Sequence, residues 1–154
     1  MATRSTIAIE REDGTVAQVY CHWDGYLSNN GRLLFQFYNE PSRIEQLIEL
    51  GDISSLKPEI GEKHDFDWFF KKDGITDEMK NIYENMWTTF YGRDRGEEGT
   101  EARVYKDFSE YNTKANFEEY DYVFRSGVWY VQEHGARWKR LDLALQAEDV
   151  LEDM

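Results

Sequence analysis

Two short turn sequences, Asp13-Gly14 and Ser126-Gly127, constrain the fold of this chain most. Asp-Gly is typical of tight hairpins because both residues tolerate positive φ, and Ser126-Gly127 is a two-residue connection of the same kind. Each joins two strand-like stretches with apolar side chains at intervals, 5–10 and 15–23 for the first turn and 120–125 and 128–132 for the second. The sequence therefore predicts one antiparallel hairpin near each end of the chain.

Apolar residues recur at helical spacing after the first hairpin. One such stretch begins at Gly31 and a second at Pro41-Ser42, where Ser42 and Glu45 have the spacing of a capping box. Gly51 is well placed as the left-handed residue after the last turn. The sequence therefore predicts two helices, or one broken helix, over 31–50.

The central part of the chain is less regular. Residues 52–75 contain Pro58, Gly61, Gly74 and a group of aromatic residues, and about 57–75 is interpreted as an irregular insertion. Thr76 or Asp77 can cap a following helix.

Further elements are expected after that helix. The sequence predicts an extended segment over 87–91, a charged glycine-punctuated loop over 92–99, a partner strand over 101–105 and a C-terminal helix over 141–151; Asn116 and Glu119 have capping-box spacing before an acidic turn. Strands and helices are mixed along the chain without a βαβ rhythm. We therefore expect a single α+β domain over 1–154, with a mainly antiparallel sheet built from the N- and C-terminal hairpins and packed helices.

The charge of the chain is strongly acidic. It has 31 Asp and Glu against 18 Lys and Arg, a formal net charge of −13, together with 5 Trp, 10 Tyr and 9 Phe that supply a core. An anionic surface repels nucleic acid phosphates and anionic lipid and attracts Lys- and Arg-rich protein surfaces. We expect a basic protein partner, with no direct binding to nucleic acid or membrane.

The cellular compartment is predicted from the cysteine count and the N-terminus. Cys21 is the single cysteine, which excludes an internal disulfide and suits a reducing environment. Residues 1–8 lack the apolar core of a secretory signal, and no run approaches the ~20 apolar residues of a membrane span. We expect a cytoplasmic protein.

The string Cys21-His22-Trp23-Asp24-Gly25-Tyr26 is a first candidate site. His22 and Asp24, two residues apart at a strand exit, can act as a base and its orienting carboxylate. In a strand they also share a face and can simply hydrogen-bond each other, with Trp23 in the core, and this structural interpretation is favoured. A Cys21–His22 dyad is disfavoured because adjacent strand residues face opposite ways.

The string Gly92-Arg93-Asp94-Arg95-Gly96-Glu97 is a second candidate. Two arginines between glycines can hold a phosphate or carboxylate bidentately. Asp94 and Glu97 can instead neutralise them, and the Gly-Lys-Ser/Thr end of a phosphate loop is missing, so an internally ion-paired loop is favoured.

His64, Asp65 and Asp67, with Glu62 or Asp73 nearby, are potential metal ligands. Their spacing matches no metal-binding motif, so a solvent-exposed acidic loop is favoured, and the sequence predicts no metal, cofactor or catalytic residue.

Acidic residues gather in the last third of the chain and would give an extended negative field if they shared one face. The candidates for this partner-binding surface are Asp107, Glu110, Glu118, Glu119, Asp121, Glu148, Asp149, Glu152 and Asp153.

Several strings together resemble a family of small bacteriophage- and prophage-encoded proteins for which no activity is established. They are Thr3-Arg4-Ser5-Thr6-Ile7-Ala8-Ile9, Asp13-Gly14, Tyr20-Cys21-His22-Trp23-Asp24-Gly25-Tyr26, Leu50-Gly51-Asp52-Ile53-Ser54-Ser55-Leu56, Gly92-Arg93-Asp94-Arg95-Gly96-Glu97 and Gly127-Val128-Trp129-Tyr130. The resemblance implies a phage accessory protein acting in the host bacterial cytoplasm.

The leading hypothesis is a non-enzymatic inhibitor that binds a basic surface of a host protein, such as a nucleic-acid-handling defence enzyme, in the extreme as a DNA mimic. The alternative is a small anionic-ligand or nucleotide-binding protein or enzyme in which His22, Asp24 and Tyr26 meet Arg93, Asp94, Arg95 and Glu97 in one site. A structural component of the phage is a third hypothesis.

Overall fold

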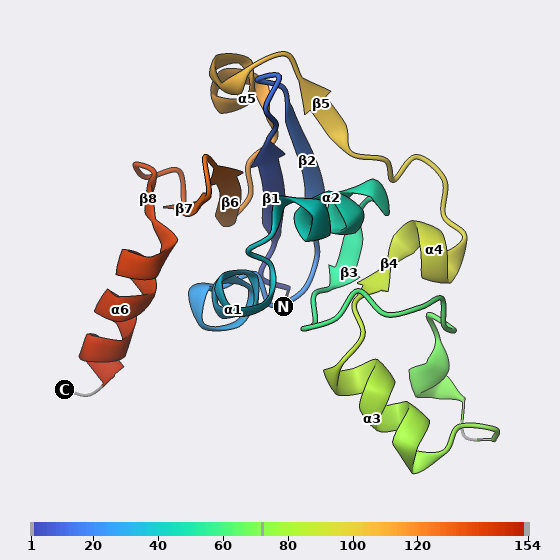
Figure 1. Ribbon diagram of the computed structural model, residues 1–154. Helices are drawn as coiled ribbons and strands as arrows, with labels where there is room; N and C mark the ends of the chain where they lie inside the picture. The colour runs from blue at the N-terminus through green and yellow to red at the C-terminus, as the bar shows by residue number, and fades with distance from the viewer. Residues whose placement is uncertain (1, 72, 153–154) are drawn as a thin grey trace.

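The computed structural model describes residues 2–71 and 73–152 and has an α+β fold (Figure 1). The strands are β1 (Ser5–Glu10), β2 (Val16–Cys21), β3 (Ile53–Ser55), β4 (Thr89–Phe90), β5 (Arg103–Tyr105), β6 (Tyr120–Arg125), β7 (Val128–Glu133) and β8 (Lys139–Arg140). The helices are η1 (Leu27–Gly31), α1 (Arg32–Phe37), α2 (Pro41–Glu49), η2 (Trp68–Phe70), α3 (Asp77–Asn85), α4 (Tyr91–Arg95), α5 (Phe108–Lys114) and α6 (Leu141–Glu152).

Both predicted hairpins are confirmed, and they lie side by side in one sheet. The order is β4-β3-β2-β1-β6-β7-β8, and β5 pairs with the first half of β2, residues 16–18. The N-terminal hairpin meets the C-terminal one through a parallel pairing of β1 with β6, in which Ser5 lies opposite Tyr120 and Ile9 opposite Phe124. The other long pairings are antiparallel, so the sheet is mainly antiparallel, as expected.

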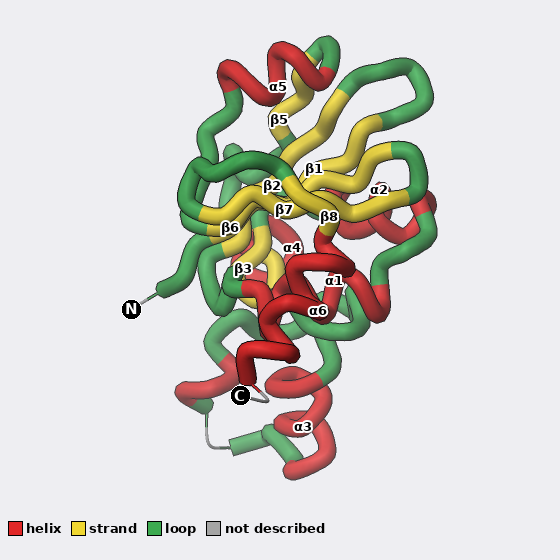
Figure 2. Tube along the Cα trace, turned by 90° about the vertical axis from the view of Figure 1, so that its left-hand side faces the viewer, coloured by secondary structure: helices red, strands yellow, loops and turns green. Residues whose placement is uncertain are grey.

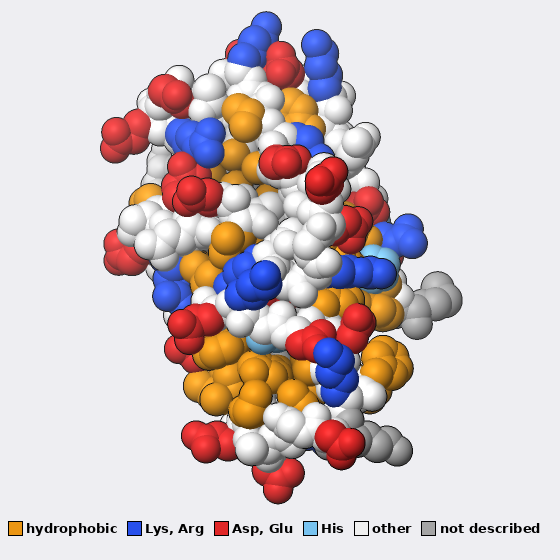
Figure 3. All heavy atoms as spheres, turned by 90° about the vertical axis from the view of Figure 1, so that its right-hand side faces the viewer, with side chains coloured by type: hydrophobic (Ala, Val, Ile, Leu, Met, Phe, Trp, Pro, Cys, Tyr) orange, Lys and Arg blue, Asp and Glu red, His pale blue; other side chains and the backbone are white. Residues whose placement is uncertain are grey.

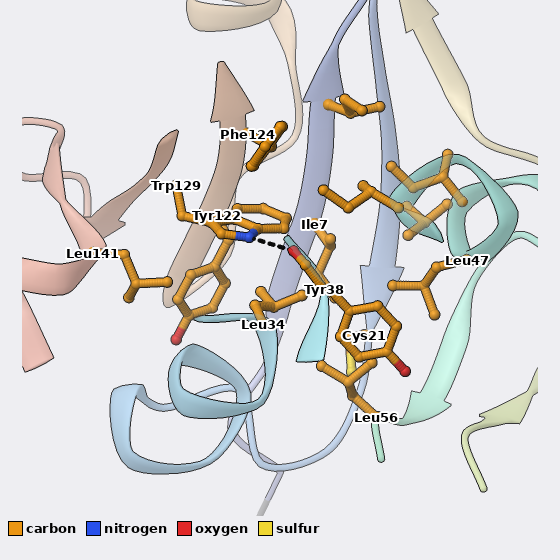
Figure 4. Packing of buried hydrophobic residues seen from close by; sticks show 14 of the residues in the cluster. Ile7, Cys21, Leu34, Tyr38, Leu47, Leu56, Tyr122, Phe124, Trp129 and Leu141 are labelled. Atoms are coloured by element: carbon orange, nitrogen blue, oxygen red, sulfur yellow. Dashed lines mark hydrogen bonds between the residues drawn. The ribbon is translucent and has the colours of Figure 1, made fainter. Parts of the chain in front are cut away.

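One face of the sheet carries the main core. Ile7 and Val19 point to this face from β1 and β2, Tyr122 and Phe124 from β6, and Trp129 from β7, because alternate residues of a strand share a face. Helices α1, α2 and α6 cover it. Figure 4 shows Ile7, Tyr122 and Trp129 packed near Tyr38. The backbone carbonyl of Tyr38 accepts a 2.8 Å hydrogen bond from Trp129 Nε1.

The other face carries a smaller core beneath α5. Ala8, Val16 and Val123 project from the strands, and Tyr111 of α5 packs on them with no exposed surface. Aromatic neighbours close this cluster: Tyr105, Phe108, Phe117, Tyr130 and Trp138. Helices α5 and α6 therefore lie on opposite faces of the sheet.

The region predicted as an irregular insertion contains short elements separated by loops. Residues 56–67 have little regular structure, η2 is a single short turn, and α3 begins at Asp77 with the Thr76 side chain accepting from Met79 N, as a helix cap should. Gly51, just after the end of α2, has the left-handed φ of +83° that was predicted for it.

Two capping predictions were wrong. Helix α2 begins at Pro41 and its cap position is Glu40, two residues earlier than the predicted Ser42 cap, and Glu45 pairs with Arg11 of the first hairpin instead. No helix begins at Asn116; α5 ends before it and is capped by Asp107, which accepts from Glu110 N at 2.8 Å.

The segment 87–105 also differs from the prediction. The strand is confined to Thr89–Phe90, and Tyr91–Arg95 forms a short helix rather than a loop, ending at Gly96 with φ of +75°. Residues 103–105 pair with β2 and not with the 87–91 segment. The short helix follows β4 directly because Asp94 accepts the backbone N–H of Phe90 and so turns the chain into α4.

Candidate functional site

The corner after β2 is built by packing rather than by a His22–Asp24 pair. The strand ends at Cys21 and Asp24 has φ of 55°, so the two side chains do not share a strand face as predicted. His22 Nδ1 instead lies 2.7 Å from the Tyr20 hydroxyl, and its ring packs edge-on against Trp23 at 4.7 Å. Trp23 is 43% exposed, so its prediction as a core residue was wrong.

Gly25 explains why the chain turns at this corner. A Cβ atom there would lie 2.6 Å from Ser5 Cβ, and the Gly25 N–H donates to the Thr3 carbonyl at 2.8 Å. The Gly25 carbonyl accepts from the Tyr122 hydroxyl at 2.7 Å. The corner therefore holds β1, β2 and β6 together, while Trp23 and Tyr26 remain partly exposed beside it.

Arg93 is saturated by acceptors of its own chain. Nε and Nη2 donate to the two carboxylate oxygens of Asp94 at 3.0 and 3.2 Å, Nη1 donates to the carbonyls of Ile60 and Gly61, and Nη2 also donates to the carbonyl of Thr88. A guanidinium has five N–H groups, and all five are used in this way. No donor of Arg93 is left for an anionic ligand, which removes the main support for a phosphate-binding loop here.

Asp94 is the centre of the same network. Its side chain is fully buried and also accepts the backbone N–H groups of Phe90 at 2.8 Å and His64 at 3.0 Å. Arg95 points elsewhere, with its guanidinium 5.0 Å from the ring centroid of Phe66, and Glu97 is exposed. The ion-paired interpretation of this string is therefore the one that the geometry supports.

His64 belongs to the Asp94 network and is not in a solvent-exposed loop, contrary to the prediction. It is 6% exposed, its ring stacks on Tyr83 at 4.9 Å, Nδ1 lies 2.8 Å from the Glu62 carbonyl and Nε2 lies 3.1 Å from Thr89 Oγ1. A carbonyl accepts only, so Nδ1 carries a proton. His64 is engaged on both ring nitrogens and fastens the insertion to β4. Asp67 is exposed, and Asp65 pairs with Lys71.

The first candidate string, 21–26, and the second, 92–97, do not share polar contacts. The side-chain contacts of His22 are with Tyr20 and Trp23. Those of Arg93 are with Asp94, the insertion and Thr88 beside β4. The joint anionic-ligand site proposed from the sequence therefore has no support in these contacts. Within residues 2–71 and 73–152, no group of three or more His, Cys, Asp or Glu side chains is arranged to hold a metal ion.

The predicted acidic surface is divided between two faces of the sheet. Asp107 and Glu110 lie at the start of α5, whereas Glu148, Asp149 and Glu152 lie on α6. Figure 2 shows α5 uppermost and α6 below the strands. Asp149 pairs with Arg32, and Asp153 lies outside the described residues. The two groups therefore do not form one continuous acidic field.

Asp121 does not belong to a partner-binding surface, and its prediction as a surface residue was wrong. It points from β6 to the face under α5 and has no exposed area. Its Oδ1 accepts from Thr6 Oγ1 at 2.6 Å and from Glu118 N at 3.1 Å, which ties the segment before β6 to the sheet; Glu118 and Glu119 on that segment are half-buried. Burial raises the pKa of Asp121 to about 6, against the lowering effect of these hydrogen bonds.

The two hairpin turns enclose a depression with a volume of about 670 Å³. Its floor is Ile9 and Phe124, which lie opposite each other in the β1–β6 pairing and are each 3% exposed. Its rim comes from the β1–β2 turn, the β6–β7 turn and the first turns of α2: Glu10, Arg11, Glu12, Asp13, Pro41, Glu45, Ser126 and Gly127. We call it the hairpin-end depression.

Carboxylates dominate the rim of the hairpin-end depression. The rim holds the carboxylates Glu10, Glu12, Asp13 and Glu45 and the cation Arg11. Arg11 Nε donates to Glu45 at 2.9 Å, and Glu10 accepts from Nε of Arg125 at 3.1 Å, so Glu12 and Asp13 are the rim carboxylates without an ion pair among the described residues. Glu12 is exposed at the turn. Hydrogen bonds from the hydroxyl and N–H of Thr15 lower the pKa of Asp13, which favours its ionised form. The site thus combines an apolar floor with an anionic rim.

Sequence reasoning missed this site although part of the signal was present. The Arg11-Glu12-Asp13-Gly14 turn is visibly charged. What the sequence does not show is that the second hairpin lies beside the first and that Pro41 starts a helix at the same place. Both depend on pairings between distant segments.

No family model, curated protein or solved structure matches this chain. No described helix combines the length and apolar character needed to cross a bilayer.

Proposed function

We propose that this protein is a non-enzymatic phage accessory protein that binds a basic surface of a host bacterial protein, such as the nucleic-acid groove of a defence enzyme, and occludes it. The observation that supports this most is the hairpin-end depression, where four carboxylates surround an apolar floor.

The chemistry of the depression selects its occupant. Lys and Arg side chains have an apolar stem and a cationic head, so the stem can lie on Ile9 and Phe124 while the head meets Glu12 or Asp13. An anionic ligand would be repelled by the same rim. The depression therefore fits a cationic side chain presented by another protein.

The net charge of the whole chain also favours a basic partner. A formal net charge of −13 attracts a basic surface over long range and accelerates encounter, while the depression supplies short-range specificity. Nucleic-acid-binding grooves are rich in Lys and Arg, so a protein that fills one blocks its normal ligand.

Affinity capture from a lysate of the bacterial host, followed by mass spectrometry and by titration with the purified partner, tests the proposal. We expect a basic partner whose affinity falls steeply with added salt, because exposed charges are screened beyond about 10 Å at 0.1 M salt. An affinity that is the same at low and high salt would refute the electrostatic mechanism.

Charge-reversal variants test whether the partner binds at the hairpin-end depression. Glu12→Lys should weaken binding to the purified partner by about tenfold, a step of about 1.4 kcal/mol. Glu98→Lys, an equal charge change at an exposed position after α4, is the matched control and should have a smaller effect. Equal effects of the two variants would show that only net charge matters and that the depression is not the contact.

A further inference from the structure

A row of polar side chains crosses the face of the sheet under α5, beside the smaller core. Tyr20, Thr6, Asp121 and Gln132 lie opposite one another in the successive pairings of β2, β1, β6 and β7. Paired residues of neighbouring strands share a face, so these four side chains point the same way. Thr6, Asp121 and Gln132 are buried. Buried polar side chains are exceptions to the usual distribution of residues and call for a specific role.

One end of this row opens into a pocket of about 270 Å³. Its lining comes from β1, β2, β5, the start of β3 and the segment between α5 and β6: Thr6, Gln18, Tyr20, Asp52, Arg103, Asn116 and Glu118. We call it the sheet-face pocket. Pockets for drug-sized molecules have volumes of about 300–1,000 Å³, so this one fits a smaller ligand.

Two hydroxyl groups of the row present acceptors to the sheet-face pocket. The Thr6 hydroxyl donates its single proton to Asp121 Oδ1 at 2.6 Å, which leaves oxygen lone pairs. The Tyr20 hydroxyl lies 2.7 Å from His22 Nδ1. Whichever partner donates in that bond, the phenol oxygen keeps a lone pair. Both oxygens can therefore accept from a ligand.

The sheet-face pocket also holds a negative charge that no described residue neutralises. Arg103 donates from Nη1 and Nη2 to the two oxygens of Asp52 at 2.6 and 3.1 Å, so these two charges compensate each other. Glu118 is half-buried and has no ion pair among the described residues. A partly buried charge is stabilised when an opposite charge joins it.

The surroundings of the pocket do not provide that opposite charge. Burial raises the pKa of Tyr20 to about 12; Arg4 opposes this rise and Glu118 adds to it, so both charges act on the hydroxyl. Arg4, however, is exposed and is not part of the lining. Figure 3 views the side of the molecule that carries β5 and α4 and shows Lys and Arg side chains interspersed with Asp and Glu side chains. Selectivity for a cation must therefore come from the pocket itself.

We propose that the sheet-face pocket binds a primary ammonium group. An ammonium has three N–H donors and no acceptor, and the Glu118 carboxylate, the Thr6 hydroxyl oxygen and the Tyr20 hydroxyl oxygen supply three acceptors. Its charge compensates that of Glu118. The site goes beyond the proposed function and does not depend on it, because it lies on the face under α5, whereas the floor of the hairpin-end depression belongs to the main core.

Titration of the isotopically labelled protein with n-butylamine, followed by backbone amide NMR shifts at neutral pH, tests the site. We expect saturable shifts at residues 6, 18, 20 and 118. Butyrate, which has the same chain length and the opposite charge, should cause none. Saturable binding of butyrate in the pocket would overturn the proposal. Shifts with n-butylamine that are confined to residues 10–13 would assign the amine to the hairpin-end depression and would also overturn it.

A lysine derivative distinguishes the two natural sources of an ammonium group. N-acetyl-lysine methylamide carries the same group on a peptide backbone. Binding at least as tight as that of n-butylamine would identify the source as a lysine of another protein. Weaker binding would identify it as a free amine, for which the backbone is an obstruction.

Charge-neutralising variants test the role of Glu118. Glu118→Gln keeps the shape of the side chain and removes its charge, and it should raise the dissociation constant for n-butylamine by at least about tenfold. Glu12→Gln is the matched control, because it makes the same change at the hairpin-end depression, and it should leave the constant unchanged. Equal effects of the two variants would mean that net charge alone attracts the amine, and they would overturn the site.

Tyr20→Phe tests the hydroxyl contact. Loss of one acceptor should raise the dissociation constant for n-butylamine by about threefold to tenfold. Tyr26→Phe, at an exposed position of the neighbouring corner, is the control and should have no effect. Circular dichroism establishes that each variant folds. An unchanged affinity of a folded Tyr20→Phe variant would overturn the arrangement of three acceptors.

Discussion

Arg93 and Asp94 are adjacent in the chain and form a bidentate ion pair in which every remaining N–H of the arginine donates to a backbone carbonyl. The carbonyls come from Ile60 and Gly61 of the insertion and from Thr88 beside β4. The pair therefore joins the insertion to the edge of the sheet. A charged string that could be taken for an anion-binding loop is a structural clamp.

Asp94→Asn should destabilise the protein strongly. The change leaves the largely buried guanidinium of Arg93 without its counter-charge, and breaking a buried ion pair by removing one partner costs about 3–5 kcal/mol. Urea denaturation measures the difference. Arg95→Gln is the control, because Arg95 is exposed and its loss should cost less than about 1 kcal/mol. Similar midpoints for the two variants would contradict the clamp.

The sequence predicted the hairpins because their signals are local. The turns at Asp13-Gly14 and Ser126-Gly127 specify which strand pairs with its neighbour, and the Thr76 cap and Gly51 terminus are equally local. The parallel pairing of β1 with β6 is set by side-chain packing between distant segments. No spacing within either segment encodes it.

Burial explains why the candidate site was predicted less well than the fold. Asp94, His64 and Asp121 look like ordinary polar residues of charged strings, and only their three-dimensional neighbours show that each is buried and hydrogen-bonded. Conversely, Phe69 and Phe70 look like core residues and are exposed. Residue type predicts average burial, and functional or structural exceptions are where it fails.

Asp121 should make the protein less stable as the pH rises from about 4 to 6. Burial raises its pKa to about 6, from an ordinary value of 3.8, so the folded state holds the proton more tightly than the unfolded state does. Stability from this group is complete below pH 3.8 and is lost as the pH rises through about 6, by about 3 kcal/mol in total.

The isosteric variant Asp121→Asn isolates that effect. Its amide resembles the protonated acid, so the variant and the wild type should have similar unfolding free energies at pH 4, and the variant should be the more stable at pH 7. Chemical denaturation at several pH values measures both. A difference that stays constant with pH would mean that Asp121 titrates normally.

Trp129→Phe should cost about 1–3 kcal/mol by leaving the buried Tyr38 carbonyl without its donor. Trp129 is 3% exposed, whereas Trp23 is 43% exposed, so Trp23→Phe is a matched control with a smaller expected effect. Thermal unfolding of both variants gives the comparison. Equal losses would indicate that the hydrogen bond shown in Figure 4 contributes little beyond ring packing.

Gly51→Ala should be more destabilising than Gly96→Ala, although both glycines have positive φ, +83° and +75°. A left-handed backbone costs an alanine about 1–2 kcal/mol at either position. At Gly51 the added Cβ would also lie 2.3 Å from the Thr100 carbonyl oxygen, whereas nothing lies within 4 Å of a Cβ at Gly96. That carbonyl accepts the Asp52 N–H at 2.8 Å, so the Thr100 segment cannot withdraw without losing the bond.

We expect the clash to add about 1–3 kcal/mol to the cost at Gly51, measured by urea denaturation of the two variants. Equal costs would show that the segment before β5 yields freely, and that its contact with Gly51 does not help to hold β5 against β2.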